Sequence, residues 1–359
     1  MANTIEALAY LLGFSQSNAQ DARLRGRRKL AGCSPDAPFK TVSKPSFYVT
    51  QPMRMGMAQP LMSLGFALGQ GGSSRFNALE LTDIGHDFVN NALIDFRPYK
   101  RIVADHLLKW IDGETDRNNT DALCSALSPL SPIPKRAAAI LVEQLAKGDG
   151  AGRRESAMAW VRNPQRSSQW NTRPSEIEQA HWTDLDAGAR FFAMRDAAST
   201  CLDAVEVEMA RQGLFTLSFS NVAGFEKVKT AIQDAKRHAK QLLVLNHLPE
   251  GAKDAEVFAK LLADGQLRQT IQFLVERDGR ILLGTSEGIS RGSAFDSTIK
   301  DGQERREEDD DVEDAGATIQ LPMGISGRVR NLALLCLDLD GKLDGWLKGG
   351  SLPSERGTA

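Results

Sequence analysis

The chain has 359 residues, of which 42% are hydrophobic and 25% charged, a balance typical of folded globular proteins and not of disordered chains. Its formal net charge of -2 excludes a protein that binds nucleic acid or anionic membranes through an overall positive field, so any such site must be a local patch. The length allows two or three domains.

The cysteines and the apolar runs indicate a cytoplasmic protein. Cys33, Cys124, Cys201 and Cys336 are far apart and form no CxxC pair, so we expect reduced thiols and neither a zinc knuckle nor a disulfide framework. No stretch reaches the roughly 18 apolar residues of a membrane-spanning helix. The N-terminus lacks the basic region and cleavage site of a signal peptide.

Residues 1–52 are predicted to contain a helix, a basic segment and a linker. The helix covers 4–14, where apolar residues recur at helical spacing and Thr4 is placed to cap the first turn. The basic residues that follow are Arg23, Arg25, Arg27, Arg28 and Lys29. A linker rich in proline and serine then runs over 34–52.

The letters AYLLGFSQSNA, followed by GCSP, give residues 8–35 a resemblance to the last helix-turn-helix of AraC-type regulators. In that family a Leu-Gly-Phe-Ser stretch precedes the recognition helix. Here Gln20, Asp21 and Gly26 interrupt the family's Phe-Arg-Arg pattern, and the GxSP element comes later. The alternative is a docking helix with a solvated basic tail.

Residues 53–95 are predicted to form a helix, a hairpin and a second helix. The first helix would pack Met57, Leu61, Leu64 and Leu68 inward. The glycine- and serine-rich stretch 69–77 is typical of a hairpin tip, and LELT predicts a short returning strand. The second helix would begin at Thr82 or Asp83 as the cap. It would bury Ile84, Phe88 and Leu93.

This order of elements, with Gly85 early in the second helix, resembles the end of a winged-helix domain of the MarR type. The resemblance implies a nucleic-acid-binding wing at 69–77, in which Arg75, helped by Ser73 and Ser74, contacts the phosphate backbone or minor groove of duplex DNA. The residues that would widen the patch are Arg54, Arg25, Arg27 and Arg28. The alternative is an ordinary helix–hairpin–helix without that role.

Helices dominate the predictions for residues 96–165. Pro98 is placed in the first turn of a helix whose apolar stripe is formed by Tyr99, Ile102, Val103, His106, Leu107 and Trp110. Pro134 begins another helix, which Gly148 ends, and 153–161 forms a shorter one. The polar stretch 165–174 is the expected hinge.

The range 174–300 is predicted to be a helical domain. A long helix with apolar residues at helical spacing ends at Gly213. Residues 223–245 carry a heptad seam, too short for a free coiled coil and suited to a neighbouring helix in the same chain. A short helix covers 255–263. The following TIQFLVERDGRILLG fits either a hairpin about Asp278–Gly279 or a helix leading into one strand.

The C-terminal part combines an acidic loop with a predicted strand. Residues 301–316 carry clustered charge and almost nothing apolar, which predicts a disordered loop that proteases cut first. In 317–359, the run NLALLCLDLD predicts a buried strand and a tail.

The sequence contains no complete catalytic or metal-binding motif. The string LLCLDLDGKLDG resembles the opening motif of haloacid-dehalogenase phosphotransferases at Asp338 and Asp340, but too few residues follow for the rest of that fold. The same string lacks the glycine and glutamate of an EF-hand. We therefore expect no metal and no cofactor, and a scattered active site stays open as a third interpretation.

The sequence thus predicts a mainly α protein with small α+β parts: a winged-helix-like N-terminal module, a helical middle and a small α+β C-terminal region. The first functional hypothesis is a nucleic-acid-binding or regulatory protein. The second is a non-catalytic adaptor or structural subunit of a multiprotein assembly, which uses the winged helix and the helical seam for protein contacts, since one fold serves both roles.

Overall fold

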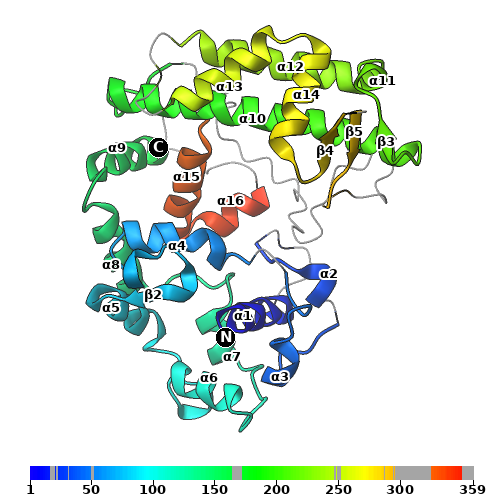
Figure 1. Ribbon diagram of the computed structural model, residues 1–359. Helices are drawn as coiled ribbons and strands as arrows, with labels where there is room; N and C mark the ends of the chain where they lie inside the picture. Colours follow the sequence, from blue (N-terminus) through cyan, green and yellow to red (C-terminus); the bar gives the residue numbers. More distant parts are fainter. Residues whose placement is uncertain are drawn as a thin grey trace. The chain divides into compact units, whose positions relative to one another are not determined.

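A computed structural model describes residues 1–16, 21, 23–30, 32–49, 52–163, 172–245, 248, 252–286, 288–293, 295 and 325–349. The described chain is mainly α-helical, with one two-stranded and one three-stranded antiparallel sheet, which confirms the prediction of a mainly α protein with small α+β parts. It divides into two compact units (Figure 1). Unit 1 comprises Met1–Pro164, Arg306–Gln320 and Ala333–Ala359, and unit 2 comprises Gln165–Arg305 and Leu321–Leu332.

Unit 1 contains short and medium helices and one hairpin. Its elements are α1 (Ala2–Gln16), α2 (Arg27–Leu30), α3 (Phe39–Val42), α4 (Arg54–Ser63), β1 (Ala67–Gly69), η1 (Gln70–Gly72), η2 (Phe76–Ala78), β2 (Leu79–Leu81), α5 (Asp83–Leu93), η3 (Pro98–Lys100), α6 (Val103–Ile111), α7 (Asp121–Leu127), α8 (Lys135–Leu145), α9 (Ala151–Arg162) and α16 (Leu343–Gly349). The predicted helices over 134–148 and 153–161 correspond to α8 and α9.

The core of unit 1 is built around α1, which contacts α3, α4 and α7. Leu8 and Leu12 are fully buried there, as the helical spacing of the apolar residues predicts. Trp110 of α6 joins this core, and its indole N–H donates to the carbonyl of Ala37 at 3.0 Å. The prediction that Thr4 caps the helix is wrong, because α1 already begins at Ala2 and Thr4 is buried within its first turns.

The helix predicted from Pro98 begins later, at Val103. Tyr99 and Lys100 have φ angles of 50° and 65°, a left-handed conformation that cannot continue a right-handed helix. As a result Tyr99 and Ile102 are largely exposed, whereas Val103 is buried as predicted.

Unit 2 is a helical layer with a small sheet. Its elements are α10 (Gln179–Arg211), β3 (Thr216–Leu217), α11 (Phe219–Val222), α12 (Glu226–Leu243), α13 (Lys253–Asp264), α14 (Leu267–Asp278), β4 (Leu282–Thr285) and β5 (Gly288–Arg291). The strands are ordered β3-β5-β4 and both pairs are antiparallel. The helix-then-strand alternative over 267–285 is the one observed, since α14 leads into β4 and Gly279 ends the helix with a φ of 57°.

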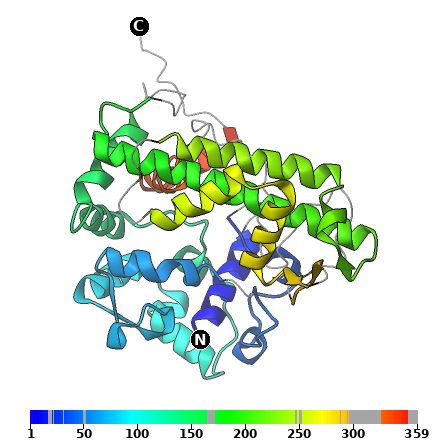
Figure 2. The same ribbon diagram turned by 45° about the horizontal axis from the view of Figure 1, so that its top comes forward.

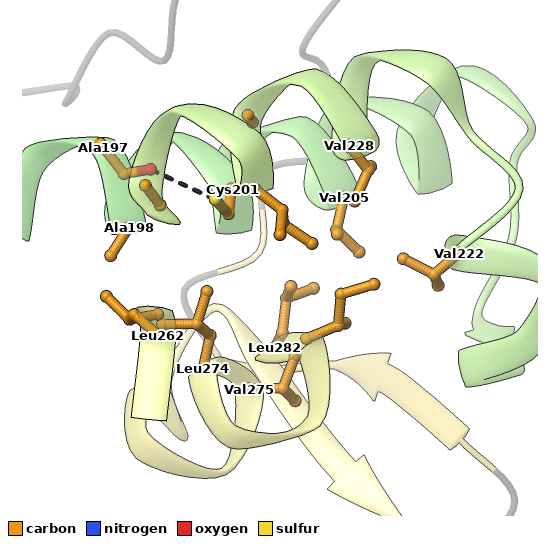
Figure 3. Packing of buried hydrophobic residues seen from close by; sticks show 14 of the residues in the cluster. Ala197, Ala198, Cys201, Val205, Val222, Val228, Leu262, Leu274, Val275 and Leu282 are labelled. Atoms are coloured by element: carbon orange, nitrogen blue, oxygen red, sulfur yellow. Dashed lines mark hydrogen bonds between the residues drawn. The ribbon is translucent and has the colours of Figure 1, made fainter. Parts of the chain in front are cut away.

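The long helices α10 and α12 pack side by side and antiparallel (Figure 2). Arg190 of α10 donates to the carbonyl of Gln241 near one end of the pair. Val205 and Val228 lie together nearer the other end (Figure 3). The buried face of α12 contains Val228, Ile232, Ala235, Ala239 and Leu242. The predicted heptad seam is therefore confirmed as a contact within the chain.

The predicted C-terminal strand is wrong. Residues 331–339 belong to α15 (Gly327–Leu339), which crosses the boundary between the ranges of the two units at residue 333. Val329, Ala333 and Cys336 are buried at a spacing of four and three residues, as on one helical face. The run is apolar on almost every position, so it shows no period that distinguishes a strand from a helix. The acidic range 301–316 and most of the hinge 165–174 lie outside the described residues.

Candidate interaction module

The predicted hairpin of residues 67–81 is present. Strands β1 and β2 are antiparallel, with Ala67 opposite Leu81, Leu68 opposite Glu80 and Gly69 opposite Leu79. Gly71 and Gly72 form the tip with φ angles of 58° and 76°, values that glycine adopts without the strain a side chain would add. The sequence thus located the hairpin, its tip and the returning strand.

A compact junction joins the hairpin to α5. The hydroxyl of Thr82 donates to the carbonyl of Gly65 at 2.6 Å and accepts from the backbone N–H of Gly85 at 3.1 Å, which confirms Thr82 as the helix cap. A Cβ on Gly85 would lie only 2.1 Å from the carbonyl oxygen of Phe66. The early glycine of α5 is therefore required by the close approach of the Phe66 backbone, just before β1.

Three residues predicted to be buried are exposed. Leu68 is 66% exposed, because the neighbouring Ala67 faces inward and successive side chains of a strand point to opposite faces. Met57 and Ile84 are also exposed. Only Ala58 is fully buried in α4, so this helix leaves most of its surface uncovered by unit 1.

The surface of the module is apolar and acidic. Its exposed large apolar side chains are Met53, Met55, Met57, Leu68, Leu81, Ile84, Val89 and Ile94. The exposed acidic residues Glu80, Asp83 and Asp87 lie on β2 and the first half of α5. The carboxylate of Glu80 accepts a hydrogen bond from the Gln70 amide at the base of the tip. Negative charge is therefore adjacent in the sequence to the exposed Leu81 and Ile84.

Two of the predicted nucleic-acid contacts, Arg75 and Ser74, are exposed on the tip. The half-buried Ser73 holds the same turn, since its hydroxyl accepts from the backbone N–H of Arg75 at 3.3 Å. The tip therefore exposes the guanidinium of Arg75 and the side chain of Ser74 to solvent.

Arg54 is half-buried at the start of α4, where its Nε is buried without a hydrogen-bond partner among the described residues. Beside it lies a residue that sequence reasoning missed. The carboxylate of Glu6 accepts from the backbone N–H groups of Met53 at 2.7 Å and Arg54 at 3.2 Å, and from the Tyr48 hydroxyl at 3.3 Å. Glu6 thus caps α4 from a distant part of the chain.

The predicted basic cluster is engaged within unit 1. Arg23 forms ion pairs with Asp21 and Asp344, both at 2.7 Å. Arg25 and Arg27 are half-buried. Burial raises the pKa of Tyr10 above its ordinary value. The positive charge of Arg25 acts in the opposite direction and reduces this rise. The side chain of Arg28 lies outside what the structure describes. The AraC-type resemblance implies a recognition helix after the first helix. Residues 27–30 form only a single helical turn, α2.

The acidic C-terminal string also has structural partners. Asp340 forms an ion pair with Arg162 at 3.0 Å. Burial raises the pKa of Asp338 above its ordinary value. Across the described residues, no group of three or more histidine, cysteine or acidic side chains is arranged to hold a metal ion. Within the same residues, no helix is long and apolar enough to span a membrane.

Comparison with known proteins gives no relative. No protein-family model matches the sequence, and neither a curated protein nor a solved structure matches it. The function must therefore be argued from the module itself.

Proposed function

We propose that residues 53–95 form a winged-helix-like module through which this protein docks on another protein, as a non-catalytic adaptor in a multiprotein assembly. The observation that carries the proposal is the exposure of large apolar side chains on the module, above all Leu68 at 66% and Met55 at 62%. These side chains lie on or beside α4, β1, β2 and α5, which contact one another in turn, and a contiguous exposed apolar patch is typical of a binding surface.

The chemistry of α4 favours protein over DNA. A helix that reads DNA needs donors and acceptors for phosphates and base edges. Apart from Gln59, the exposed positions of α4 offer Met55, Met57, glycine, proline and serine. Methionine is flexible and polarisable, and it serves well on protein-binding surfaces.

The acidic residues specify the chemistry of the partner. Glu80, Asp83 and Asp87 would repel a phosphate backbone, whereas they complement lysine and arginine around an apolar protein surface. The expected partner is therefore a protein whose contact surface is apolar with a basic rim. The free thiols of the described cysteines are compatible with the cytoplasm as the compartment in this proposal.

Site-specific photocrosslinking in the native host tests the proposal. A benzophenone amino acid would replace Leu68, with exposed Glu143 of α8 as the control position. We expect one discrete protein adduct at position 68, absent at position 143 and lost when Met57→Asp is added. Equal adducts at both positions, or no protein adduct at position 68, would contradict the adaptor role.

Duplex DNA is the second candidate ligand, because Arg75 is exposed on a glycine- and serine-rich tip. Here DNA affinity would be measured across salt for the wild type and Arg75→Ala. Loss of one phosphate contact should lower the log–log salt slope by roughly 0.9. Binding at low salt that depends on Arg75 would favour the nucleic-acid or regulatory role. If no DNA binding that depends on Arg75 is found at low salt, the adaptor role remains as the proposed function.

A further inference from the structure

The exposed side of α12 and its C-cap residue line a shallow, open groove in unit 2, formed by other residues than the module of the proposed function. The groove has a volume of about 470 Å³ and is lined by Gln233, Lys236, Arg237, Lys240, Gln241 and Val244. These positions follow a spacing of three and four residues, so they form one continuous stripe along the helix. The opposite stripe of α12 is buried in the core.

The three cations of the stripe differ in their hydrogen-bond and ion-pair partners. Lys236 donates to the carbonyl of Gly265, and Arg237 pairs with Asp234 while its side chain stays 64% exposed. Lys240 is exposed and has no ion pair with any residue that the structure describes. The stripe thus offers two accessible cations, Arg237 and Lys240, one turn apart.

An apolar residue ends the stripe. Val244 is 71% exposed. The aliphatic stems of the lysines add further apolar surface beneath their charged groups. The stripe therefore combines cationic groups with an exposed apolar side chain at one end.

The geometry points to an acidic protein segment as the ligand of this groove, bound as an amphipathic helix with carboxylates toward Arg237 and Lys240 and an apolar side chain against Val244. Charge complementarity supports this occupant. A helical ligand matches the spacing, since carboxylates three or four residues apart meet cations with the same spacing.

Nucleic acid fits the groove less well. None of the six lining residues is aromatic, so bases would have no stacking surface. The missing stacking surface favours a ligand whose negative charges are spaced along a helix.

Fluorescence anisotropy of the full-length protein tests the inference. The probe is a fluorescein-labelled peptide of repeated Glu-Glu-Leu-Glu, and a Lys-Lys-Leu-Lys peptide is the charge-reversed control. Lys240→Ala and Arg237→Ala should each weaken binding of the acidic peptide roughly 1.5- to fivefold, as expected for exposed ion pairs. Val244→Ser should weaken it roughly fivefold through lost apolar contact. Raising the salt from roughly 50 to 300 mM should weaken binding further.

A matched control lies on the same helix. Lys229→Ala removes the same charge outside the groove, where Lys229 pairs with Glu226, and should leave affinity unchanged. Circular dichroism of each variant verifies that α12 stays folded. The inference is overturned if the acidic peptide does not bind, if Lys229→Ala matches Lys240→Ala, or if single-stranded DNA of equal charge binds as tightly with the same variant pattern.

Discussion

Among single residues, Glu6 connects the N-terminal helix with the candidate module. Its carboxylate accepts from the first free N–H groups of α4 and from Tyr48. A negative charge at a helix N-terminus is favoured by the helix dipole as well as by the hydrogen bonds. The contact therefore fixes where α4 begins.

We expect Glu6→Ala to lower the free energy of unfolding by about 1–2 kcal/mol, because the cap and its favourable charge are both lost. Glu6→Gln should retain part of the cap. Urea unfolding measures the effect. The control is Glu143→Ala, which removes an exposed pair with Lys147 and should change stability by less than about 0.5 kcal/mol. A Glu6→Ala loss no larger than that of the control would show that Glu6 does not cap α4.

His106 is a buried histidine with a defined hydrogen-bond partner. Its ring is 0% exposed, its Nε2 lies 3.2 Å from Asn118 Oδ1, and its Nδ1 has no partner among the described residues. The Asn118 amide donates to the carbonyl of Pro35, so its oxygen faces the imidazole, whose Nε2 donates. Burial, aided by the charge of Arg101, lowers the pKa of His106, although the bond to Asn118 opposes this shift.

This shift predicts a pH dependence of stability. In the unfolded chain His106 takes up a proton near pH 6.5, whereas the folded state keeps it neutral to lower pH. The contribution of the neutral His106 to the free energy of unfolding is therefore fully present above about pH 6.5. It is lost as the pH falls toward the lowered pKa of the folded state. Unfolding by urea at about pH 7.5 and about pH 5.5 should differ less in His106→Gln than in the wild type.

The exposed His86 provides the comparison. His86→Gln should keep the wild-type dependence on pH. An equal dependence in His106→Gln and the wild type would mean that another group causes the loss of stability in acid.

The sequence predicted caps well only where they are local. Thr82 bonds to Gly85, three residues further along, so the residue types and their spacing were visible together. Glu6 and Met53 are 47 residues apart, and nothing in the local pattern of either indicates the other. The ion pair between Arg23 and Asp344, which are 321 residues apart, could not be predicted for the same reason.

At the scale of elements, Gly85 sets how closely α5 approaches the hairpin. We expect Gly85→Ala to lower the free energy of unfolding by about 1–3 kcal/mol, because the new methyl group would force the helix away from the Phe66 carbonyl. Thermal unfolding measures the change.

Gly56→Ala is the matched control within the same module. Gly56 lies in α4 with nothing within 4 Å of a Cβ, so alanine should be neutral or stabilise by up to about 1 kcal/mol. If Gly85→Ala were as well tolerated as Gly56→Ala, the close packing of the Phe66 backbone on α5 would be wrong.

Elements with a clear period were predictable, and those without one were not. The seam of α12 alternates three- and four-residue spacings, which only a helix explains. The apolar run of α15 has no such alternation, and its helical state depends on packing that the sequence does not display. The exposure of Leu68 was missed for a related reason, since the helix was expected to extend through residue 68, where the chain is already a strand.

At the scale of the whole molecule, each unit has a core of its own. The core of unit 1 includes Leu8, and that of unit 2 includes Ile232. Because apolar burial is the main stabilising contribution to folding, the stability of each unit should respond to its own core.

Hydrogen exchange of two variants tests this independence. Ile232→Ala should destabilise by about 2–5 kcal/mol and reduce amide protection in α10 and α12, while α1 and α7 keep theirs. Leu8→Ala should have the reverse pattern. A loss of protection that spreads evenly over both units in either variant would show that they unfold as one.

The proposed contact of residues 53–95 with protein through their apolar surface is tested most directly by the yield of the photocrosslinked adduct at position 68, measured in Met57→Asp and in Arg75→Asp backgrounds. The adaptor account predicts that Met57→Asp removes most of the adduct, because a charge in an apolar contact is costly to bury, and that Arg75→Asp leaves it intact. A protein adduct that survives Met57→Asp and is lost in Arg75→Asp would contradict the account.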